Sequence, residues 1–145
     1  MNNTITIKSY NQLPEEARVI RIEVFVDEQG FNEEFDTVDY EAIHFLAFNS
    51  QGESVGTCRI FNKDDKSIFY LGRLAVLKSC RGLKVGSALI AECENYARRV
   101  GASEIRLHSQ YRAKDFYHKC GYTEYGEIED EEGCPHIWMK KHIGE

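Results

Sequence analysis

Residues 71–87 read LGRLAVLKSCRGLKVGS and decide the fold that we expect for this chain. The apolar run 71–77 predicts a buried strand, a basic turn containing glycine follows, and Val85 opens a long amphipathic run. The first turn of a helix has backbone N–H groups without intrahelical partners and carries a partial positive charge. A short glycine-containing loop before such a helix can therefore bind a diphosphate, and Arg81 and Lys84 add full charges beside it.

Two other phosphate-binding loops do not match this turn. A nucleotide-triphosphate P-loop ends in Gly-Lys-Ser/Thr, and its lysine reaches the terminal phosphates. Here Val85 follows Lys84, and no lysine separates Gly86 from Ser87. The dinucleotide fingerprint, with glycines at its first, third and sixth positions, is missing as well. A solvated connection between a strand and a helix is the simplest alternative for a basic turn of this kind.

Composition indicates one globular domain over residues 1–145. The hydrophobic fraction is 42% and the charged fraction 29%, which disfavours disorder. The N-terminus lacks a basic start and an apolar core, and no apolar run approaches membrane-spanning length. We therefore expect a cytoplasmic protein without a membrane partner. The net charge of −6 disfavours a nucleic-acid partner, because phosphate backbones select for an excess of lysine and arginine.

The five cysteines are widely spaced and include no C-x-x-C pair. Reduced thiols fit this spacing, and we expect no metal because no set of zinc ligands is present. Cys120 lies two residues from His118, but neighbours two apart on a helix point in different directions. A cysteine–histidine nucleophile is therefore disfavoured.

The rest of the chain alternates between strand and helix signals. Three helices are expected, at residues 13–25, 85–100 and 113–120. Strands are expected at residues 5–7, 43–48, 55–61, 68–77, 104–109, 122–128 and 136–140, the last two forming a hairpin around the acidic segment 129–133. Because a helix separates 68–77 from 104–109, these two strands should run parallel. We therefore predict an α/β fold with a mixed, mostly antiparallel sheet of six to seven strands and helices on both faces.

Residues 81–87, RGLKVGS, resemble the pyrophosphate loop of the GNAT superfamily of acetyl-CoA-dependent N-acetyltransferases. That family usually has Arg/Gln-x-x-Gly-x-Gly/Ala. This chain matches at Arg81 and Gly86 and has Lys84 at the middle glycine position. Residues 116–122, FYHKCGY, resemble a second motif, Phe-Tyr-x-x-x-Gly-Phe/Tyr, which follows the fifth strand in these enzymes. With both motifs at the right separation, the order of elements is similar to the GNAT fold along nearly the whole chain.

The resemblance implies acetyl-CoA as co-substrate and suggests where it binds. Leu74, Ala75 and Val76 would align the pantetheine arm, and a backbone N–H there would receive the developing oxyanion. Gly72 is a plausible place for the bulge that this strand carries in the superfamily, although a central strand with one glycine is the simpler reading. The other coenzyme-binding residues would be Arg81, Gly82, Leu83, Lys84, Val85, Gly86, Ser87 and Phe116.

Tyr117 is the residue that we expect to act as general acid. After an amine attacks the thioester, a thiolate must leave, and a phenol held near the sulfur can protonate it. Reference pKa values of about 10 for tyrosine and about 8.5 for a thiol keep the phenol protonated at neutral pH. A core tyrosine on an amphipathic helix is the alternative.

The amine must be neutral when it attacks, so a base or a water relay is also expected. The candidates are Glu33, Glu34, His44, His108 and His136. We single out Glu34, and His108 at the end of the parallel strand, as catalytic candidates. For each histidine, a hydrogen-bonded or exposed side chain is the simpler reading.

Segments 24–29, 108–110 and 133–139 resemble the ElaA-like and YjcF-like branch of the superfamily, whose acceptors are poorly defined. Residues 23–41 contain eight carboxylates and no lysine or arginine, and the part from Asp27 to Glu41 falls where this fold places its acceptor-binding loop. They form either a solvated face or a surface that attracts a cationic amine. Residues 116–121 also resemble glucosamine-6-phosphate N-acetyltransferases. That substrate ranks low, because a sugar phosphate would need a basic pocket.

The sequence therefore predicts an N-acetyltransferase that acts on a primary amine of a small molecule or peptide, by direct attack in a ternary complex. One rival is a non-catalytic acyl-CoA-binding or regulatory module on the same fold. Another is a protein-interaction domain whose acidic loop binds a basic partner. Terminal strands in small folds of this kind often pair between subunits, so a homodimer remains open.

Overall fold

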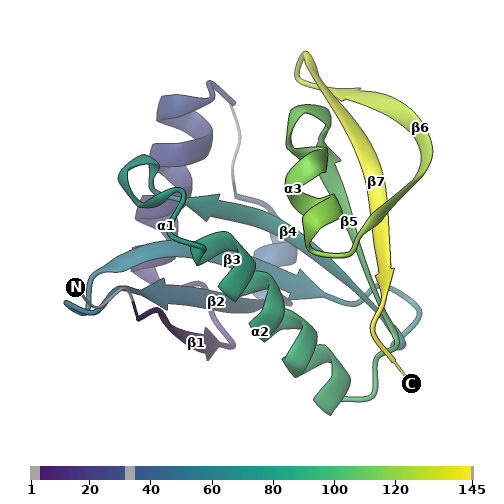
Figure 1. The fold of residues 1–145 in the computed structure, drawn as a ribbon, viewed down its shortest axis with the longest axis horizontal. Coiled ribbons are helices and arrows are strands. Elements are labelled where there is room, and N and C mark those ends of the chain that lie inside the picture. Colours follow the sequence, from purple (N-terminus) through teal and green to yellow (C-terminus); the bar gives the residue numbers. More distant parts are fainter. Residues whose placement is uncertain (1–3, 32–34, 145) are drawn as a thin grey trace.

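The computed structural model describes residues 4–31 and 35–144. Seven strands in these residues form one sheet in the order β1-β2-β3-β4-β5-β7-β6, and every neighbouring pair is antiparallel except β4 with β5 (Figure 1). The strands are β1 (Thr6–Tyr10), β2 (Ile43–Phe48), β3 (Ser54–Phe61), β4 (Ile68–Val76), β5 (Glu104–Gln110), β6 (Thr123–Glu131) and β7 (Cys134–His142). The predicted mixed sheet and its one parallel pair are confirmed.

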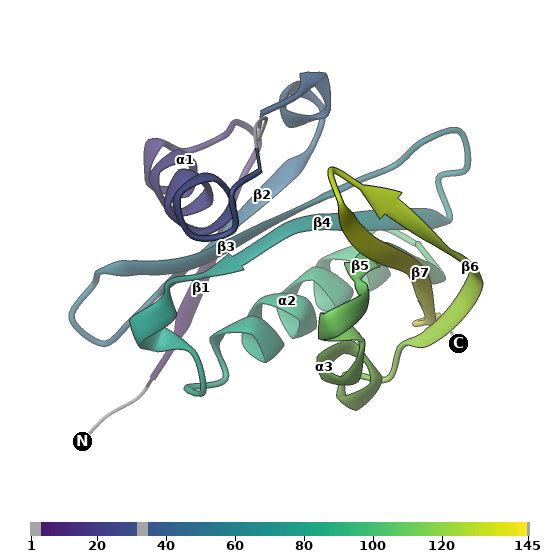
Figure 2. The same ribbon diagram turned by 90° about the horizontal axis from the view of Figure 1, so that it is seen from above.

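Helices lie on both faces of this sheet, as predicted (Figure 2). On one face lie α1 (Glu15–Arg21) and the π-helical segment η1 (Ile22–Glu28), and on the other α2 (Val85–Arg99) and α3 (Lys114–Lys119). The described residues also contain three short 3-10 turns: η2 (Thr37–Tyr40), η3 (Lys78–Cys80) and η4 (Tyr111–Ala113).

The layer formed by α1 and η1 buries a helical stripe of apolar residues. Ala17, Ile20 and Val24 pack against Leu46 of β2 and Ala75 of β4. The first helix was expected to end near residue 25, but the chain stays helical to residue 28 in the wider π form. The N–H of Gln29, for example, donates to the carbonyl of Val24, five residues back, at 3.1 Å. This extension carries residues 25–29 to the edge of the cleft described below.

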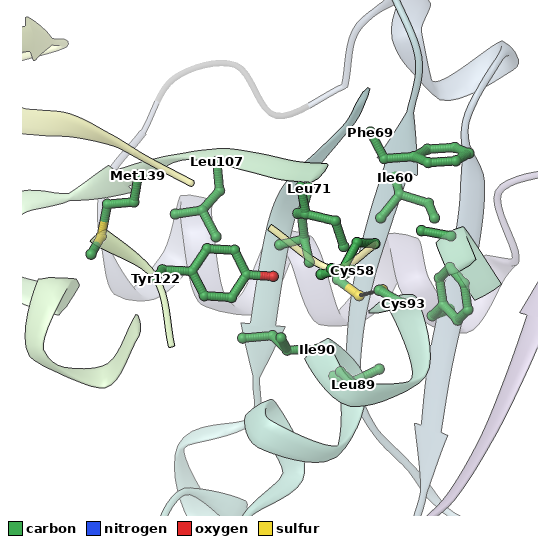
Figure 3. Packing of buried hydrophobic residues seen from close by; sticks show 14 of the residues in the cluster. Cys58, Ile60, Phe69, Leu71, Leu89, Ile90, Cys93, Leu107, Tyr122 and Met139 are labelled. Carbon is green, nitrogen blue, oxygen red and sulfur yellow. Dashed lines mark hydrogen bonds between the residues drawn. The ribbon is translucent and has the colours of Figure 1, made fainter. Parts of the chain in front are cut away.

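The larger core lies between the sheet and α2 (Figure 3). Leu89, Ile90 and Cys93 of α2 belong to one buried cluster with Cys58 of β3 and Leu71 of β4. The sulfur atoms of Cys58 and Cys93 are 3.3 Å apart, and both cysteines are free thiols. The sheet and α2 are thus held together by close apolar packing.

The last hairpin differs from its prediction. Residues 129–131 belong to β6, and the turn consists of Glu132 and Gly133, with φ angles of 50° and 79°. Two consecutive positive φ angles are typical of a tight type I′ hairpin turn. β6 is an edge strand, and almost all of its side chains are exposed. Polar residues on both of its faces therefore cost little stability, and the acidic run 129–131 gave no apolar pattern from which a strand could be predicted.

We predict that Leu89→Ala lowers the free energy of unfolding by about 2 to 5 kcal/mol, because Leu89 is fully buried and its truncation leaves a cavity. Val100, which was expected on the buried face of this helix, is 56% exposed. Val100→Ala is therefore a matched control that should change stability by no more than about 0.5 kcal/mol. Urea unfolding followed by circular dichroism measures both, and equal losses would contradict the observed packing.

Candidate active site

A cleft begins where β4 and β5 separate. The two strands pair in parallel from Ile68 with Glu104 to Leu71 with Leu107, and there the ladder ends although both strands continue. Beyond this point β4 stays paired with β3, and β5 stays paired with β7. The edge of β4 that faces β5 therefore has no partner strand over residues 72–76 within the described chain. The cleft has a volume of about 920 Å³, and Leu74, Ala75 and Val76 line it.

A bulge in β4 lies at the same point. Thr57 of β3 faces Ala75, but Arg59 faces Gly72, so β4 has one residue more than β3 over this interval. Arg73 takes a φ angle of 52° there. The predicted bulge beside Gly72 is confirmed, although the positive φ falls on the arginine. Bulges bend a strand and turn its groups in a new direction, which here accompanies the separation from β5.

The loop before α2 uses left-handed backbone at two positions. Gly82 has a φ angle of 86°, and Lys84, the residue that precedes α2, has φ 64° and ψ 22°. No side chain caps the N-terminus of this helix. Gly82, Lys84, Val85, Gly86 and Ser87 all line the cleft, so the positive end of α2 faces it. Leu83 is 45% exposed and is not among the lining residues.

Glycine at position 86 allows the two sequence motifs to touch. A Cβ atom there would lie 3.0 Å from Cζ of Phe116, which is tighter than an ordinary contact. In the same way, a Cβ on Gly56 of β3 would lie 2.9 Å from a methyl group of Val85. The start of α2 is therefore wedged between β3 and α3, and Phe116 joins the cleft wall beside the loop.

Arg81 is bound to a carboxylate in this structure. Its guanidinium donates two hydrogen bonds to Glu28 of η1, of 2.6 and 2.7 Å, and its Nε donates to the carbonyl of Val76 at 3.0 Å. The hydrogen bonds to Glu28 raise the pKa of Arg81, and the same contacts lower the pKa of Glu28. Arg81 therefore lines the cleft, but its guanidinium is held by Glu28 in the helical layer formed by α1 and η1.

Tyr117 lines the same cleft from α3. Its ring lies edge-on to Phe116, with 5.0 Å between ring centroids, and edge-on to Tyr122 at 6.3 Å. Burial raises the pKa of Tyr117, so its phenol is protonated at neutral pH, as a general acid requires.

The candidates for the base lie in different places. His44 is 1% exposed, its Nε2 lies 2.9 Å from the carbonyl oxygen of Asp39, and it is not among the cleft-lining residues. Burial lowers the pKa of His44, which fits a neutral core histidine. Glu33 and Glu34 lie outside the described residues. His108 and His136 both line the cleft.

Carboxylates of β6 surround His108. Its Nδ1 is 3.1 Å from Oε1 of Glu131, and its Nε2 is 3.3 Å from Oε1 of Glu129. The ring stacks on Trp138 with 4.5 Å between centroids. Glu131 also lies 3.5 Å from Nε2 of His136, so one carboxylate bridges both histidines.

Glu131 was not among the predicted site residues because its acidic neighbours were expected to form a turn. Glu129 and Glu131 are two residues apart and so would share one face of a strand, and this spacing was the signal in the sequence that could have indicated them.

Two carboxylates of the acidic segment after η1, those of Asp36 and Asp39, are paired with arginines. Arg21 donates to Asp39 at 2.9 Å, and Arg59 donates to Asp39 at 2.8 Å and to Asp36 at 2.6 Å. Burial alone would raise the pKa of Asp39, but hydrogen bonds and charge from Arg21 and Arg59 lower it to about 2. Asp36, Asp39 and Glu28 are thus paired with arginines in this structure, and the attraction of a cationic acceptor by the segment stays a prediction.

A family model for the acetyltransferase (GNAT) domain matches residues 10–143. The chain belongs to the GNAT acetyltransferase family. The uncharacterized N-acetyltransferase YjcF of Bacillus subtilis is 36% identical over 140 residues, which cover 94% of this chain and 97% of that protein. Protein ElaA of Escherichia coli is 29% identical over 131 residues, covering 86% of this chain and 84% of that protein. The predicted ElaA-like and YjcF-like branch of the GNAT superfamily is confirmed.

Solved GNAT structures share this fold. The crystal structure of Escherichia coli ElaA matches with a TM-score of 0.83 and 26% identity, and the match covers 95% of this chain and 99% of that one. An aminoglycoside 6′-N-acetyltransferase complexed with coenzyme A matches with a TM-score of 0.74 and 18% identity, over 95% and 97% of the two chains.

No helix in residues 4–31 and 35–144 of this GNAT protein has the length and apolar character needed to span a bilayer. Nor do these residues contain a group of three or more histidine, cysteine, aspartate or glutamate side chains arranged to hold a metal ion.

We predict that Asp39→Asn lowers the free energy of unfolding by about 3 to 5 kcal/mol near pH 7, because it leaves two buried arginines short of a counter-charge. The folded-state pKa of Asp39 lies below its ordinary value of 3.8, so its stabilising effect is present above that value and is lost as the pH falls toward about 2. Urea midpoints measured between neutral and acidic pH should converge for wild type and variant. The exposed Asp64→Asn is the control, and a constant difference at all pH values would contradict the assignment.

Proposed function

We propose that this GNAT protein transfers the acetyl group of acetyl-CoA to a primary amine of a small molecule or peptide, in the cytoplasm. The observation that carries the proposal is that one cleft is lined by the unpaired edge of β4 where it separates from β5, by the N-terminus of α2 and by Tyr117. The cleft volume of about 920 Å³ lies within the range of sites that hold a cofactor or a drug-sized ligand.

The coenzyme would lie along the loop and β4. Its diphosphate would accept hydrogen bonds from backbone N–H groups at the start of α2, next to Lys84. Its pantetheine arm carries amides that can pair with the free edge of Leu74–Val76, much as a short strand would. The complex of the aminoglycoside acetyltransferase with coenzyme A, on the same fold, supports this assignment.

The reaction that fits this site is direct transfer in a ternary complex. The acceptor nitrogen attacks the thioester carbon, and a backbone N–H of β4 near the bulge stabilises the oxyanion. The C–S bond then breaks, and the departing thiolate takes a proton from the hydroxyl of Tyr117. The nitrogen, which has become positively charged on attack, releases a proton that restores the phenol.

Thiol release from acetyl-CoA, measured against a panel of polyamines, amino sugars, aminoglycosides and lysine peptides, tests the proposal. Tyr117→Phe should lower turnover by about 100-fold or more, because it removes the general acid. Calorimetry should show nearly unchanged binding of acetyl-CoA. Tyr111→Phe, at an exposed tyrosine outside the cleft, is the matched control. Wild-type turnover in Tyr117→Phe, or no thiol release with any amine, would overturn the proposal.

We also predict that Glu28→Gln tightens acetyl-CoA binding by about two- to fivefold, because the carboxylate that holds Arg81 competes with the diphosphate for it. Glu23→Gln, on the same helical segment and outside the cleft, controls for the change in net charge. Calorimetric dissociation constants at fixed ionic strength give the comparison. Weaker binding in Glu28→Gln would instead mean that Glu28 positions Arg81 for the coenzyme.

A further inference from the structure

Four ionisable side chains gather at the hairpin end of the cleft. They are His108 of β5, His136 of β7, and Glu129 and Glu131 of β6. Successive side chains of a strand point to opposite faces, and the pairing of β5, β7 and β6 brings these four to one face. Figure 2 shows the β6–β7 hairpin curving to the same side of the sheet as α1.

The hydrogen-bonding pattern fixes where one proton lies. Nδ1 of His136 is 2.9 Å from the carbonyl oxygen of Cys134. A carbonyl oxygen only accepts, so Nδ1 carries the hydrogen. In a neutral His136, Nε2 then presents a lone pair to the carboxylate of Glu131, 3.5 Å away. The contact becomes attractive when a proton is shared between these two groups.

His108 is arranged in the same sense. Both ring nitrogens face carboxylates, Glu131 at 3.1 Å and Glu129 at 3.3 Å. Nδ1 is within hydrogen-bonding distance of Glu131, whereas Nε2 is buried and makes no hydrogen bond within the described residues. Stacking on Trp138 fixes the plane of this ring. The cluster thus places two imidazole rings within 3.5 Å of the carboxylate of Glu131 at the wall of the cleft.

Exposure separates the members of this cluster. The side chain of Glu131 is 54% exposed and lines the cleft, whereas His108 is 17% and His136 7% exposed. Glu129 is 59% exposed but does not line the cleft. Glu131 is therefore the carboxylate of the cluster that a substrate in the cleft can reach. The other charged residues that line the cleft are Glu132 in the hairpin turn and six cations: Arg59, Lys63, Arg73, Arg81, Lys84 and Lys119.

We propose that Glu131 binds the acceptor as an ammonium ion and takes its proton, and that His108 and His136 are positioning residues for this carboxylate. The inference rests on the proposed acetyl transfer. One N–H proton passes from R–NH3⁺ to Glu131, and the neutral amine attacks the thioester carbon. The N–C bond forms, the C–S bond breaks, and the thiolate takes the proton of Tyr117. The second amine proton restores Tyr117, and Glu131 releases its proton to water.

Glu131→Gln tests the inference, using the panel amine that releases thiol fastest. At about pH 7 its kcat/KM should fall by about 100-fold or more, the typical contribution of a general base. The deficit should shrink as the pH rises toward about 9.5, because the amine then loses its proton to solvent without help. A purely structural role would give the same deficit at every pH.

Two further variants complete the test. Glu127→Gln removes a carboxylate from the same strand, outside the cleft, and should keep the wild-type pH profile. His136→Gln keeps Glu131 but removes the imidazole that faces it, and should shift the midpoint of the pH profile. Acetyl-CoA binding by calorimetry confirms that each variant is folded.

The outcomes separate the inference from the proposed function. Wild-type rates or a pH-independent deficit in Glu131→Gln, together with impaired turnover in Tyr117→Phe, would overturn the role of Glu131 and leave acetyl transfer standing. Absence of thiol release from the wild-type protein with every amine would overturn both. A deficit in Glu131→Gln that disappears at high pH supports the assignment.

Discussion

The end of the parallel ladder between β4 and β5 is the constraint on which the site depends. Each strand remains fully held on its other side, β4 by β3 and β5 by β7. The two halves of the sheet can therefore diverge at little cost in hydrogen bonds. The extra residue of the β4 bulge turns that strand away at the level of Leu71 and Leu107, where pairing stops. An unpaired strand edge can pair with another chain and promote aggregation. In this protein the unpaired edge of β4 lines a cleft, where an amide-bearing ligand can lie along it.

Ion pairs with arginines hold in place the two aspartates that precede β2, Asp36 and Asp39. Arg21 of α1 and Arg59 of β3 share the carboxylate of Asp39, and Asp36 joins Arg59 to Arg73 at the bulge. The network links the helical layer, the sheet and the bulge through side chains that are mostly withdrawn from water. Buried ion pairs add little net stability, but breaking one is costly, so they favour a single arrangement of the chain. The acidic sequence before β2 thus serves to position structure around the cleft.

The sequence predicted those parts of the molecule in which periodicity and burial coincide. Residues 43–48 form the predicted strand and are buried on both faces, with Phe45 in the core against α2 and Leu46 in the core against α1. The apolar stripe of α1 is buried as expected, because that face of the helix packs on the sheet. The acidic end of β6 was missed since an edge strand in water needs no apolar face. The partner of Arg81 lies 53 residues away, and no local pattern indicates such a contact. Glu131 was hidden for both reasons: its strand looked like a turn, and its histidines come from other strands.

Lys84 shows how the site can tolerate a departure from the family pattern. Its φ angle of 64° lies in the left-handed region, where a side chain costs roughly 1 to 2 kcal/mol, which accounts for glycine at this position in related loops. The same lysine lines the cleft and makes no ion pair with any residue in the described part of the chain. Arg81, the other cation of the loop, is held by Glu28. Lysine in place of glycine therefore costs some backbone stability at this position. It also adds a positive charge to the cleft beside Arg81, which is already paired with Glu28.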